Sequence, residues 1–393
     1  MIYDVVVIGG GPSGATAANE LARLNRKVAF IDKEGRIKPC GGAVPPRLIK
    51  DFDIPESQIV AKITTARMIS PTARKVDIPI ENGYVGMVDR ENFDEFLRTR
   101  AKTAGAHRFT GTFLRVLRNS EENSVAVVFK EKNSLKEITL KTKLIIGADG
   151  ARSNVARAEV PGGKTIPYVI AYHEIIEAPK NSQYDPDRCD VIYNGSISPD
   201  FYGWIFPHGK SASVGMGTKK NGFDLKAATA KIRENSGLDQ CKTIRKEGAP
   251  IPLRPLDKWD NERDLVLAGD AAGVVAPSSG EGIYYAMIGG QEAAYATHQC
   301  LQTLNSKDLK LARKRFMSEH KNVFRVLEAM QNAYYKSDDR RERFVSLCKD
   351  QDVQRLTFEA YMNKKLVTRK PLAHLKIMVK NLLHLSGIIR ATT

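Results

Sequence analysis

Short, largely apolar runs recur along the chain, and each is followed by a turn of small residues or by an acid. Three of them cover residues 2–8, 144–146 and 265–267. Runs of this length are typical of strands that are buried on both faces of a parallel sheet. The first run leads through its turn into residues 15–21, which are good helix formers, and a fourth run follows at 27–31. The pattern predicts an α/β core built from strand–turn–helix–strand units.

A different pattern occupies residues 45–85 and 158–260, which do not continue this alternation of strand and helix. Apolar and polar residues alternate along 168–176 and 211–217. A period of two is typical of half-buried strands, so we expect an antiparallel sheet in this part of the chain. This sheet is predicted to form a second layer that covers the ligand site of the α/β core.

The turn after the first run has the spacing of a dinucleotide-binding turn. Gly9 allows the tight turn, Gly11 lets the backbone approach a pyrophosphate, and Gly14 lets the next helix pack close to the sheet. The helix N-terminus offers free N–H groups and a positive dipole end to phosphate. Asp32, after the fourth run, can accept hydrogen bonds from an adenosine ribose. The alternative is a glycine-rich turn that binds nothing. The residues predicted to hold the dinucleotide here are Gly9, Gly11, Pro12, Ser13, Gly14, Asp32 and Lys33.

Two further acids are predicted at the carboxyl ends of strands. Asp149 follows the run at 144–146 in the sequence Gly-Ala-Asp-Gly, and Asp270 follows the run at 265–267 in Gly-Asp-Ala-Ala-Gly. Open α/β sheets bind their ligands at this edge. Both acids therefore join the predicted site.

These three motifs, in their order and separation, resemble the glutathione-reductase-like flavoproteins of the aromatic-hydroxylase type. The resemblance implies that the dinucleotide is FAD and that Asp270 binds its ribityl chain; the alternative for Asp270 is a helix cap without a ligand. A helix is expected from Ile283 to roughly residue 304, with its N-terminus facing the flavin. Arg90 matches a flavin-side Arg of that group, whereas taken alone it is a solvated residue at a helix start. The resemblance also adds Gly269, Gly280 and Gly282 to the predicted cofactor site, beside Asp149, Asp270, Ile283 and Arg90.

This resemblance sets the expected fold class, which is α/β with α+β elements. We expect a Rossmann-type FAD-binding domain of the aromatic-hydroxylase type, an interleaved antiparallel-sheet substrate domain and a C-terminal helical region. The predicted boundaries are 1–44, 86–157 and 261–304 for the discontinuous FAD-binding domain, 45–85 and 158–260 for the substrate domain, and 305–393 for the helical, basic region.

Three segments carry a second, narrower resemblance. They are Lys38-Pro-Cys-Gly-Gly-Ala-Val-Pro-Pro-Arg47, Tyr202-Gly-Trp-Ile-Phe-Pro207 and Gly269-Asp-Ala-Ala-Gly273. Together they resemble the geranylgeranyl reductase family along the whole chain, and its chlorophyll and bacteriochlorophyll branch most closely. The resemblance implies that three of the four double bonds of a geranylgeranyl chain are hydrogenated to a phytyl tail, on the free diphosphate or on the pigment ester. It also implies NADPH as the donor, although the sequence offers no second dinucleotide turn.

Cys40, Trp204 and His208 are the candidate catalytic residues. A hydride reaches one alkene carbon and a proton must reach the other, so the substrate side needs an acid. Cys40 is a candidate because Gly41 and Gly42 let the backbone pass close to the flavin, and all three are predicted to contact the cofactor; inert buried packing is the alternative for Cys40. Trp204 is predicted to shape the substrate tunnel, with an aromatic core cluster as the alternative. His208 is a candidate phosphate ligand or proton donor, with a surface His after a turn as the alternative.

Charge adds an anionic partner for the C-terminus. The net charge is +16, and residues 301–393 hold 20 Lys plus Arg against 9 Asp plus Glu. This asymmetry favours an anionic surface or ligand. From residue 364 onward the chain has no acid and seven basic residues, namely Lys364, Lys365, Arg369, Lys370, Lys376, Lys380 and Arg390. An apolar stripe of Leu375, Met378, Val379, Leu382 and Ile389, opposite Lys376, Lys380 and His384, predicts an amphipathic helix that lies on a membrane surface or docks on its own protein.

The remaining composition bears on where in the cell the protein is located. The five cysteines are odd in number and show no C-x-x-C spacing, so neither a disulfide framework nor a metal site is indicated. The chain starts directly with a predicted strand and has no apolar run of spanning length, so we expect no cleaved signal and a cytoplasmic location. Peripheral contact with the inner or photosynthetic membrane is expected through the basic C-terminus. Nucleic acid is not expected as a partner, because no binding module is recognised.

Three other functions stay open at this point. Two are enzymes: an archaeal-type reductase of polyprenyl glycerolipids and an FAD-dependent aromatic hydroxylase. The third is a non-catalytic, flavin-bearing membrane or assembly factor. The choice between a pigment ester and a lipid ether rests only on the resemblance.

Overall fold

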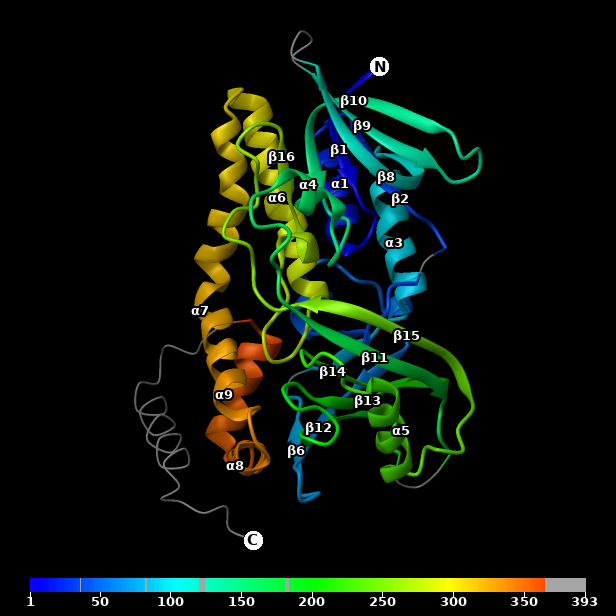
Figure 1. Cartoon of the computed structure of the whole chain (residues 1–393), viewed down its shortest axis with the longest axis vertical. Coiled ribbons are helices and arrows are strands. Elements are labelled where there is room, and N and C mark those ends of the chain that lie inside the picture. Colours follow the sequence, from blue (N-terminus) through cyan, green and yellow to red (C-terminus); the bar gives the residue numbers. More distant parts are fainter. Residues whose placement is uncertain (36, 82, 120–123, 181–183, 365–393) are drawn as a thin grey trace.

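The computed structural model describes residues 1–35, 37–81, 83–119, 124–180 and 184–364, and within them the chain forms two large sheets and one small sheet (Figure 1). The first large sheet has a parallel core in the order β8-β2-β1-β10-β16. Strand β9 pairs antiparallel with the far parts of β8 and β10. The strands are β1 (Ile2–Ile8), β2 (Val28–Asp32), β8 (His107–Asn119), β9 (Ser124–Glu131), β10 (Glu137–Gly147) and β16 (Leu265–Leu267).

The predicted α/β core is confirmed in this sheet. The strand expected at residues 2–8 is β1, and the helix that follows its turn is α1 (Pro12–Arg23). The strand expected at 27–31 is β2, which is shifted by one residue and ends at Asp32. Val5, Val6 and Val7 of β1 are fully buried, as expected for a strand covered on both faces.

The second large sheet forms the other layer. Its order is β15-β11-β14-β13-β12-β5-β6, and it fills the lower half of the molecule in Figure 1. The strands are β5 (Thr65–Ile69), β6 (Lys75–Pro79), β11 (Tyr168–Glu177), β12 (Arg188–Ile192), β13 (Gly203–His208), β14 (Ser211–Thr218) and β15 (Thr243–Pro252). The two alternating segments of the sequence become the antiparallel neighbours β11 and β14.

One pair in this sheet departs from the expected antiparallel arrangement. Strands β5 and β12 run parallel, whereas the other pairs of the sheet run antiparallel. The two strands come from segments more than 100 residues apart, so no tight hairpin forces them into opposite directions. Their pairing joins the early hairpin β5–β6 to the strands of the later segment.

Helices and a small sheet complete the described chain. The small sheet, in the order β3-β7-β4, consists of β3 (Ala43–Val44), β7 (Val85–Met87) and β4 (Ala61–Ile63). The remaining helices are α2 (Pro46–Asp51), η1 (Glu56–Gln58), α3 (Arg90–Thr103), α4 (Asn154–Glu159), α5 (Leu225–Asn235), η2 (Gly269–Ala272), α6 (Ile283–Thr303), η3 (Ser306–Lys310), α7 (Leu311–Tyr334), α8 (Asp338–Leu347) and α9 (Gln351–Met362).

The helices of the C-terminal region connect the two layers. Helix α6 begins at Ile283 as predicted, and α7 runs beside it (Figure 1). Helices α8 and α9 follow at the end of the molecule that carries the seven-stranded sheet, where α8 contacts β6. None of the helices in the described ranges is long and apolar enough to cross a membrane. The predicted amphipathic stripe from Leu375 to Ile389 lies outside the described residues.

A buried histidine joins α7 to α6. His320 packs edge-on against the rings of Tyr284 and Tyr285, and neither of its ring nitrogens has a hydrogen-bond partner in the described part of the chain. Burial, with a smaller contribution from Arg47 and Lys364, lowers the pKa of His320 to about 4. The folded protein therefore holds this imidazole neutral.

We predict that this histidine makes folding stability depend on pH. Its pKa is lower in the folded than in the unfolded chain, so its contribution is complete above about pH 6.5 and is lost as the pH falls toward 4. The loss is roughly 3 kcal/mol, since one pKa unit is about 1.4 kcal/mol. Urea unfolding of the wild type and of His320→Phe at pH 7.5 and pH 4.5 measures the difference. Equal loss of stability in the two proteins contradicts the assignment.

Candidate functional site

Two adjoining cavities lie between the layers. The larger is about 240 Å³ and mostly apolar; its wall includes Met68, Ile78 and Val191 from the seven-stranded sheet. The smaller is about 100 Å³ and polar at one end, where Pro12, Arg90 and Asp270 line it. Both cavities are lined by Cys40, Gly41, Trp204, Ile251, Gly280, Gly282 and Ile283. The segment of Cys40, the turn before α6 and Trp204 therefore form the border between the two cavities.

The dinucleotide turn has the shape that a pyrophosphate requires. Gly9 has a φ of +113°, and a Cβ there would lie 2.1 Å from the carbonyl oxygen of Ala148. A Cβ added at Gly11 would meet only open space. The Ser13 hydroxyl oxygen is buried and has no hydrogen-bond partner within the described residues. An open backbone surface beside an unsatisfied buried hydroxyl at a helix N-terminus fits an anionic phosphate ligand.

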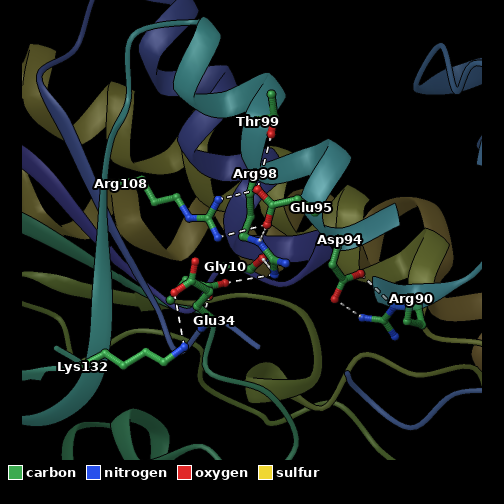
Figure 2. Close-up of polar contacts among 10 residues, drawn as sticks. Gly10, Glu34, Arg90, Asp94, Glu95, Arg98, Thr99, Arg108 and Lys132 are labelled. Atoms are coloured by element: carbon green, nitrogen blue, oxygen red, sulfur yellow. Dashed lines mark hydrogen bonds and ion pairs between the residues drawn. The ribbon is translucent and has the colours of Figure 1, made fainter. Parts of the chain in front are cut away.

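Asp32 lies against this turn, and its predicted contact with the ribose stays a prediction. Its Oδ2 accepts a hydrogen bond of 3.0 Å from Arg98, and its Oδ1 accepts one of 2.5 Å from the backbone N–H of Glu34. Arg98 also donates to the carbonyl oxygen of Gly10 and so links the acid to the turn (Figure 2). Asp32 is 6% exposed, whereas the neighbouring Lys33, also predicted to contact the cofactor, is exposed.

Arg98 is a site residue that the sequence interpretation missed. It lies on α3, two helical turns after Arg90, and Glu95 joins it to Arg108 on β8 (Figure 2). The spacing of four residues through Arg90, Asp94 and Arg98 places all three on one face of the helix. That spacing was the available signal, because charged residues on the inward face of a helix require partners.

Arg90 is not a solvated residue at a helix start. It is buried, 5% exposed, and forms two hydrogen bonds of 2.8 Å with Asp94. Burial opposes its charge, but Asp94 and Cys40 outweigh that effect and raise the pKa of Arg90. A permanent, buried guanidinium therefore lies in the wall of the smaller cavity beside Cys40. This position agrees with the flavin-side role implied by the resemblance, which stays a prediction.

The two strand-end acids have different surroundings. Asp270 receives a 2.5 Å ion pair from Lys38, a residue of the Lys-Pro-Cys-Gly-Gly segment, and lines the smaller cavity. Asp149 instead accepts hydrogen bonds from Ser153 and from the backbone N–H groups of Asn154 and Val155. Asp149 is thus the acid that caps a helix, the alternative raised for Asp270, and burial raises its pKa. A cofactor contact of Asp149 stays a prediction, with its carboxylate already engaged at α4.

The Cys40 segment passes between the cavities. Cys40 is half-buried, and its sulfur accepts a hydrogen bond of 3.4 Å from the backbone N–H of Gly42. His208 packs behind this segment, with Nε2 3.0 Å from the carbonyl oxygen of Gly41. Contrary to the alternative of a surface His, it is buried, and burial lowers its pKa. His208 lines neither of the two cavities, so its placement favours support of the Gly41–Gly42 backbone over contact with a substrate.

The aromatic run on β13 is both a core cluster and a cavity wall. Trp204 is 5% exposed, packs 6.0 Å from the ring of Tyr202 and 6.1 Å from that of Phe206, and lines both cavities. The hydroxyl of Tyr202 donates to the backbone carbonyl of Ser279 in the turn before α6. The aromatic core cluster is therefore confirmed, and the tunnel-shaping role of Trp204 stays a prediction.

The C-terminal helices fix the turn before α6. The backbone N–H of Ser278 donates to Gln331 of α7, and the hydroxyl of Ser278 lies 2.5 Å from that of Tyr361 of α9. Lys364 forms a 2.6 Å ion pair with Glu281 of the same turn and is 3% exposed. The charge count suggested a solvated basic surface, but Lys364 is buried and does not belong to one. The other six basic residues of that count lie outside the described residues.

Comparison with known proteins adds the following similarities. Residues 3–192 match the family described as pyridine nucleotide-disulphide oxidoreductase. The chain is 63% identical over 390 residues to the geranylgeranyl diphosphate reductase of Rhodobacter capsulatus, with 99% of each chain covered. It is 30% identical to the digeranylgeranylglycerophospholipid reductase of Thermoplasma acidophilum, over 92% of this chain and 95% of that protein. Among solved structures, a geranylgeranyl bacteriochlorophyll reductase-like protein of Thermoplasma acidophilum superposes with a TM-score of 0.82 and 25% identity, over 95% of this chain and 99% of the other.

We predict that Asp270 contributes directly to cofactor affinity. Asp270→Asn removes the charge that accepts hydrogen bonds in the first turn of η2, and hydrogen bonds to charged groups are the strong ones. Titration of the flavin-free protein with FAD, followed by flavin fluorescence, should show binding weakened by at least about tenfold. Asp260→Asn is the matched control, because Asp260 is also buried near β16 but outside both cavities. Equal affinity of Asp270→Asn and the wild type contradicts the assignment.

Proposed function

This chain belongs to the geranylgeranyl diphosphate reductase family, and on that premise we propose that it hydrogenates three double bonds of a geranylgeranyl chain to give a phytyl chain. It is an FAD-dependent oxidoreductase. The observation that carries the proposal is the apolar cavity of about 240 Å³ that adjoins the smaller, polar-ended cavity at Cys40 and Trp204. An apolar compartment beside the cofactor suits a polyprenyl chain, which has no polar groups along its length.

One set of residues would bind the cofactor, and another would bind the substrate. The residues that would hold FAD are the turn from Gly9 to Gly14, Asp32 with Arg98, Asp270 and Arg90. When bound and reduced, FAD supplies a hydride to one carbon of the alkene. The apolar wall of the larger cavity orients the chain and excludes water from it. The other alkene carbon then needs a proton from the protein.

We propose Cys40 as the group that holds this proton. It lies on the border between the cavities, and the buried Arg90 contributes positive charge beside its sulfur. Trp204, at the same border, is proposed to shape the path of the chain.

Three finer assignments rest on the family. NADPH is proposed as the electron donor. The head group of the substrate is proposed to be the diphosphate or the pigment ester of the (bacterio)chlorophyll branch. The reason is sequence identity, which is 63% to the geranylgeranyl diphosphate reductase and 30% to the archaeal lipid reductase. Because a polyprenyl substrate partitions into membranes, we also propose peripheral membrane contact through the basic C-terminus.

Stepwise mass gain tests the main proposal. The purified holoenzyme is incubated without oxygen with geranylgeranyl diphosphate and either NADPH or dithionite, and the products are analysed by mass spectrometry. We expect successive gains of two hydrogens, up to six in all. Oxygen uptake that depends on an aromatic substrate, without any such gain, supports the hydroxylase instead. A digeranylgeranyl glycerolipid reduced faster than the diphosphate or the pigment ester favours the archaeal-type activity.

We further predict that Cys40→Ser retains FAD but slows reduction of the alkene. A serine hydroxyl is a much weaker acid than a thiol, and general acids contribute about 10² to 10⁴ in rate. Single-turnover rates of the pre-reduced enzyme should fall at least tenfold, while flavin content stays unchanged. Cys189→Ser is the control, since Cys189 is buried and lines only the larger cavity. A similar loss in both variants, or no loss in Cys40→Ser, removes Cys40 from this role.

A further inference from the structure

A row of polar and aromatic side chains crosses four neighbouring strands of the seven-stranded sheet. Glu247 of β15 is the register partner of His173 on β11, His173 is the partner of Gly215 on β14, and Gly215 is the partner of Trp204 on β13. Ser213 lies two residues before Gly215, on the same face of β14. The row therefore leads from the edge strand β15 to the indole at the border of the two cavities.

The side chains of this row contact one another in sequence. The indole Nε1–H of Trp204 donates to the hydroxyl oxygen of Ser213 over 3.1 Å, and Ser213 lies 2.9 Å from Nδ1 of His173. Nε2 of His173 lies 3.1 Å from a carboxylate oxygen of Glu247, whose other oxygen is 2.7 Å from Nε of Arg245. Ser213, His173 and Trp204 are all buried, at 0%, 2% and 5% exposure.

The absence of a side chain at Gly215 makes this arrangement possible. A Cβ at this position would lie 2.4 Å from the Cβ of His173 and 2.6 Å from the indole carbon Cζ2 of Trp204. Any larger residue would push the two rings apart. With glycine, the rings approach across β14 to a centroid separation of 6.2 Å.

A carboxylate and a guanidinium lie at the outer end of the row. Burial opposes it, but His173 and Arg245 together keep the pKa of Glu247 below its usual value. Glu247 is therefore a carboxylate, and one of its oxygens lies 3.1 Å from Nε2 of His173. On the other side of the ring, Nδ1 of His173 faces the Ser213 hydroxyl, whose oxygen accepts the Trp204 N–H.

We propose that His173 is a positioning residue, which acts through Ser213 to fix the indole of Trp204 at the border between the cofactor and substrate cavities. The inference rests on the proposed function, because it takes Trp204 as the wall that holds the polyprenyl chain at the reacting position. A buried indole with a single satisfied donor has one preferred orientation, because rotation would leave the N–H unpaired. Fixing that wall sets which double bond meets the hydride source and at what angle.

The orientation of Trp204 can be measured without any turnover. The chain contains two tryptophans, Trp204 and Trp259, so the holoenzyme labelled with 5-fluorotryptophan gives two ¹⁹F resonances, and Trp204→Phe assigns them. We expect Ser213→Ala and His173→Phe each to shift or broaden the Trp204 resonance and to leave that of Trp259 in place. Ser198→Ala is the matched control, since Ser198 is equally buried but bonds to Gly217 and Phe201. Glu247→Gln keeps the size of the side chain at the β15 end of the row and removes its charge. It therefore tests this end of the row with a smaller change.

A positioning role also predicts that the variants change kcat more than KM. With geranylgeranyl diphosphate and NADPH, kcat should fall about tenfold in Ser213→Ala and His173→Phe while KM changes less than about threefold, and partly reduced products should accumulate. Ser213→Thr, which retains the hydroxyl, should restore most of the activity.

The outcomes separate this inference from the proposed function. If the wild type does not reduce the chain but the Trp204 resonance responds as expected, the proposed function fails and the positioning of Trp204 stands. If the resonance moves in Ser213→Ala but not in His173→Phe, the part assigned to His173 is wrong. An unchanged resonance in both variants, with normal flavin content and circular dichroism, overturns the inference altogether.

Discussion

The close approach of four backbone segments around the first turn is the constraint on which the site depends. Gly9 and Gly14 bring the turn against itself and against the end of β10, with added Cβ atoms 1.9 to 2.1 Å from carbonyl oxygens. A Cβ at Gly290 of α6 would lie 2.3 Å from the Ser13 carbonyl, and one at Gly269 would lie 2.7 Å from the Ser13 Cβ. No side chain fits at these contacts. The glycines thereby bring α1, β10, η2 and α6 close enough for one dinucleotide to reach all of them.

The two sheets then line two different environments for one reaction. On the side of the parallel sheet, Asp32, Arg98, Arg90 and Asp270 provide charges that are paired and partly or fully buried. On the side of the seven-stranded sheet, the larger cavity is mostly apolar, with the Glu281–Lys364 pair in its wall. Cys40 and Trp204 lie where the two meet. A charged cofactor and an apolar chain can therefore be held in contact, although each alone requires a different environment.

The C-terminal helices hold this border rather than only covering it. Gln331, Tyr361 and Lys364 contact the turn of residues 278–281, which leads into α6. The ion pair of Lys364 and Glu281 is buried, so removing either partner leaves an uncompensated charge in the interior. This makes the turn before α6 one of the most constrained parts of the site, although its own sequence is rich in Gly and Ser.

The sequence by itself determined the elements whose signals are local. Strand β1, helix α1, the acid Asp32 and the start of α6 at Ile283 follow from short apolar runs, glycine spacing and helix propensity. The structure places β1 and the start of α6 as predicted, and α1 begins three residues earlier and ends two residues later than the predicted 15–21. The motif segments of the chain were sufficient to indicate the family and the flavin. Only the tertiary structure decided the partners that are distant in sequence: Arg98 on Asp32, Lys38 on Asp270, and His173 with Ser213 behind Trp204. It also showed that His208 and Lys364 are buried and that β5 runs parallel to β12. These depend on which segments meet when the two layers pack, and no pattern of neighbouring residues encodes the distance between positions that lie tens to hundreds of residues apart.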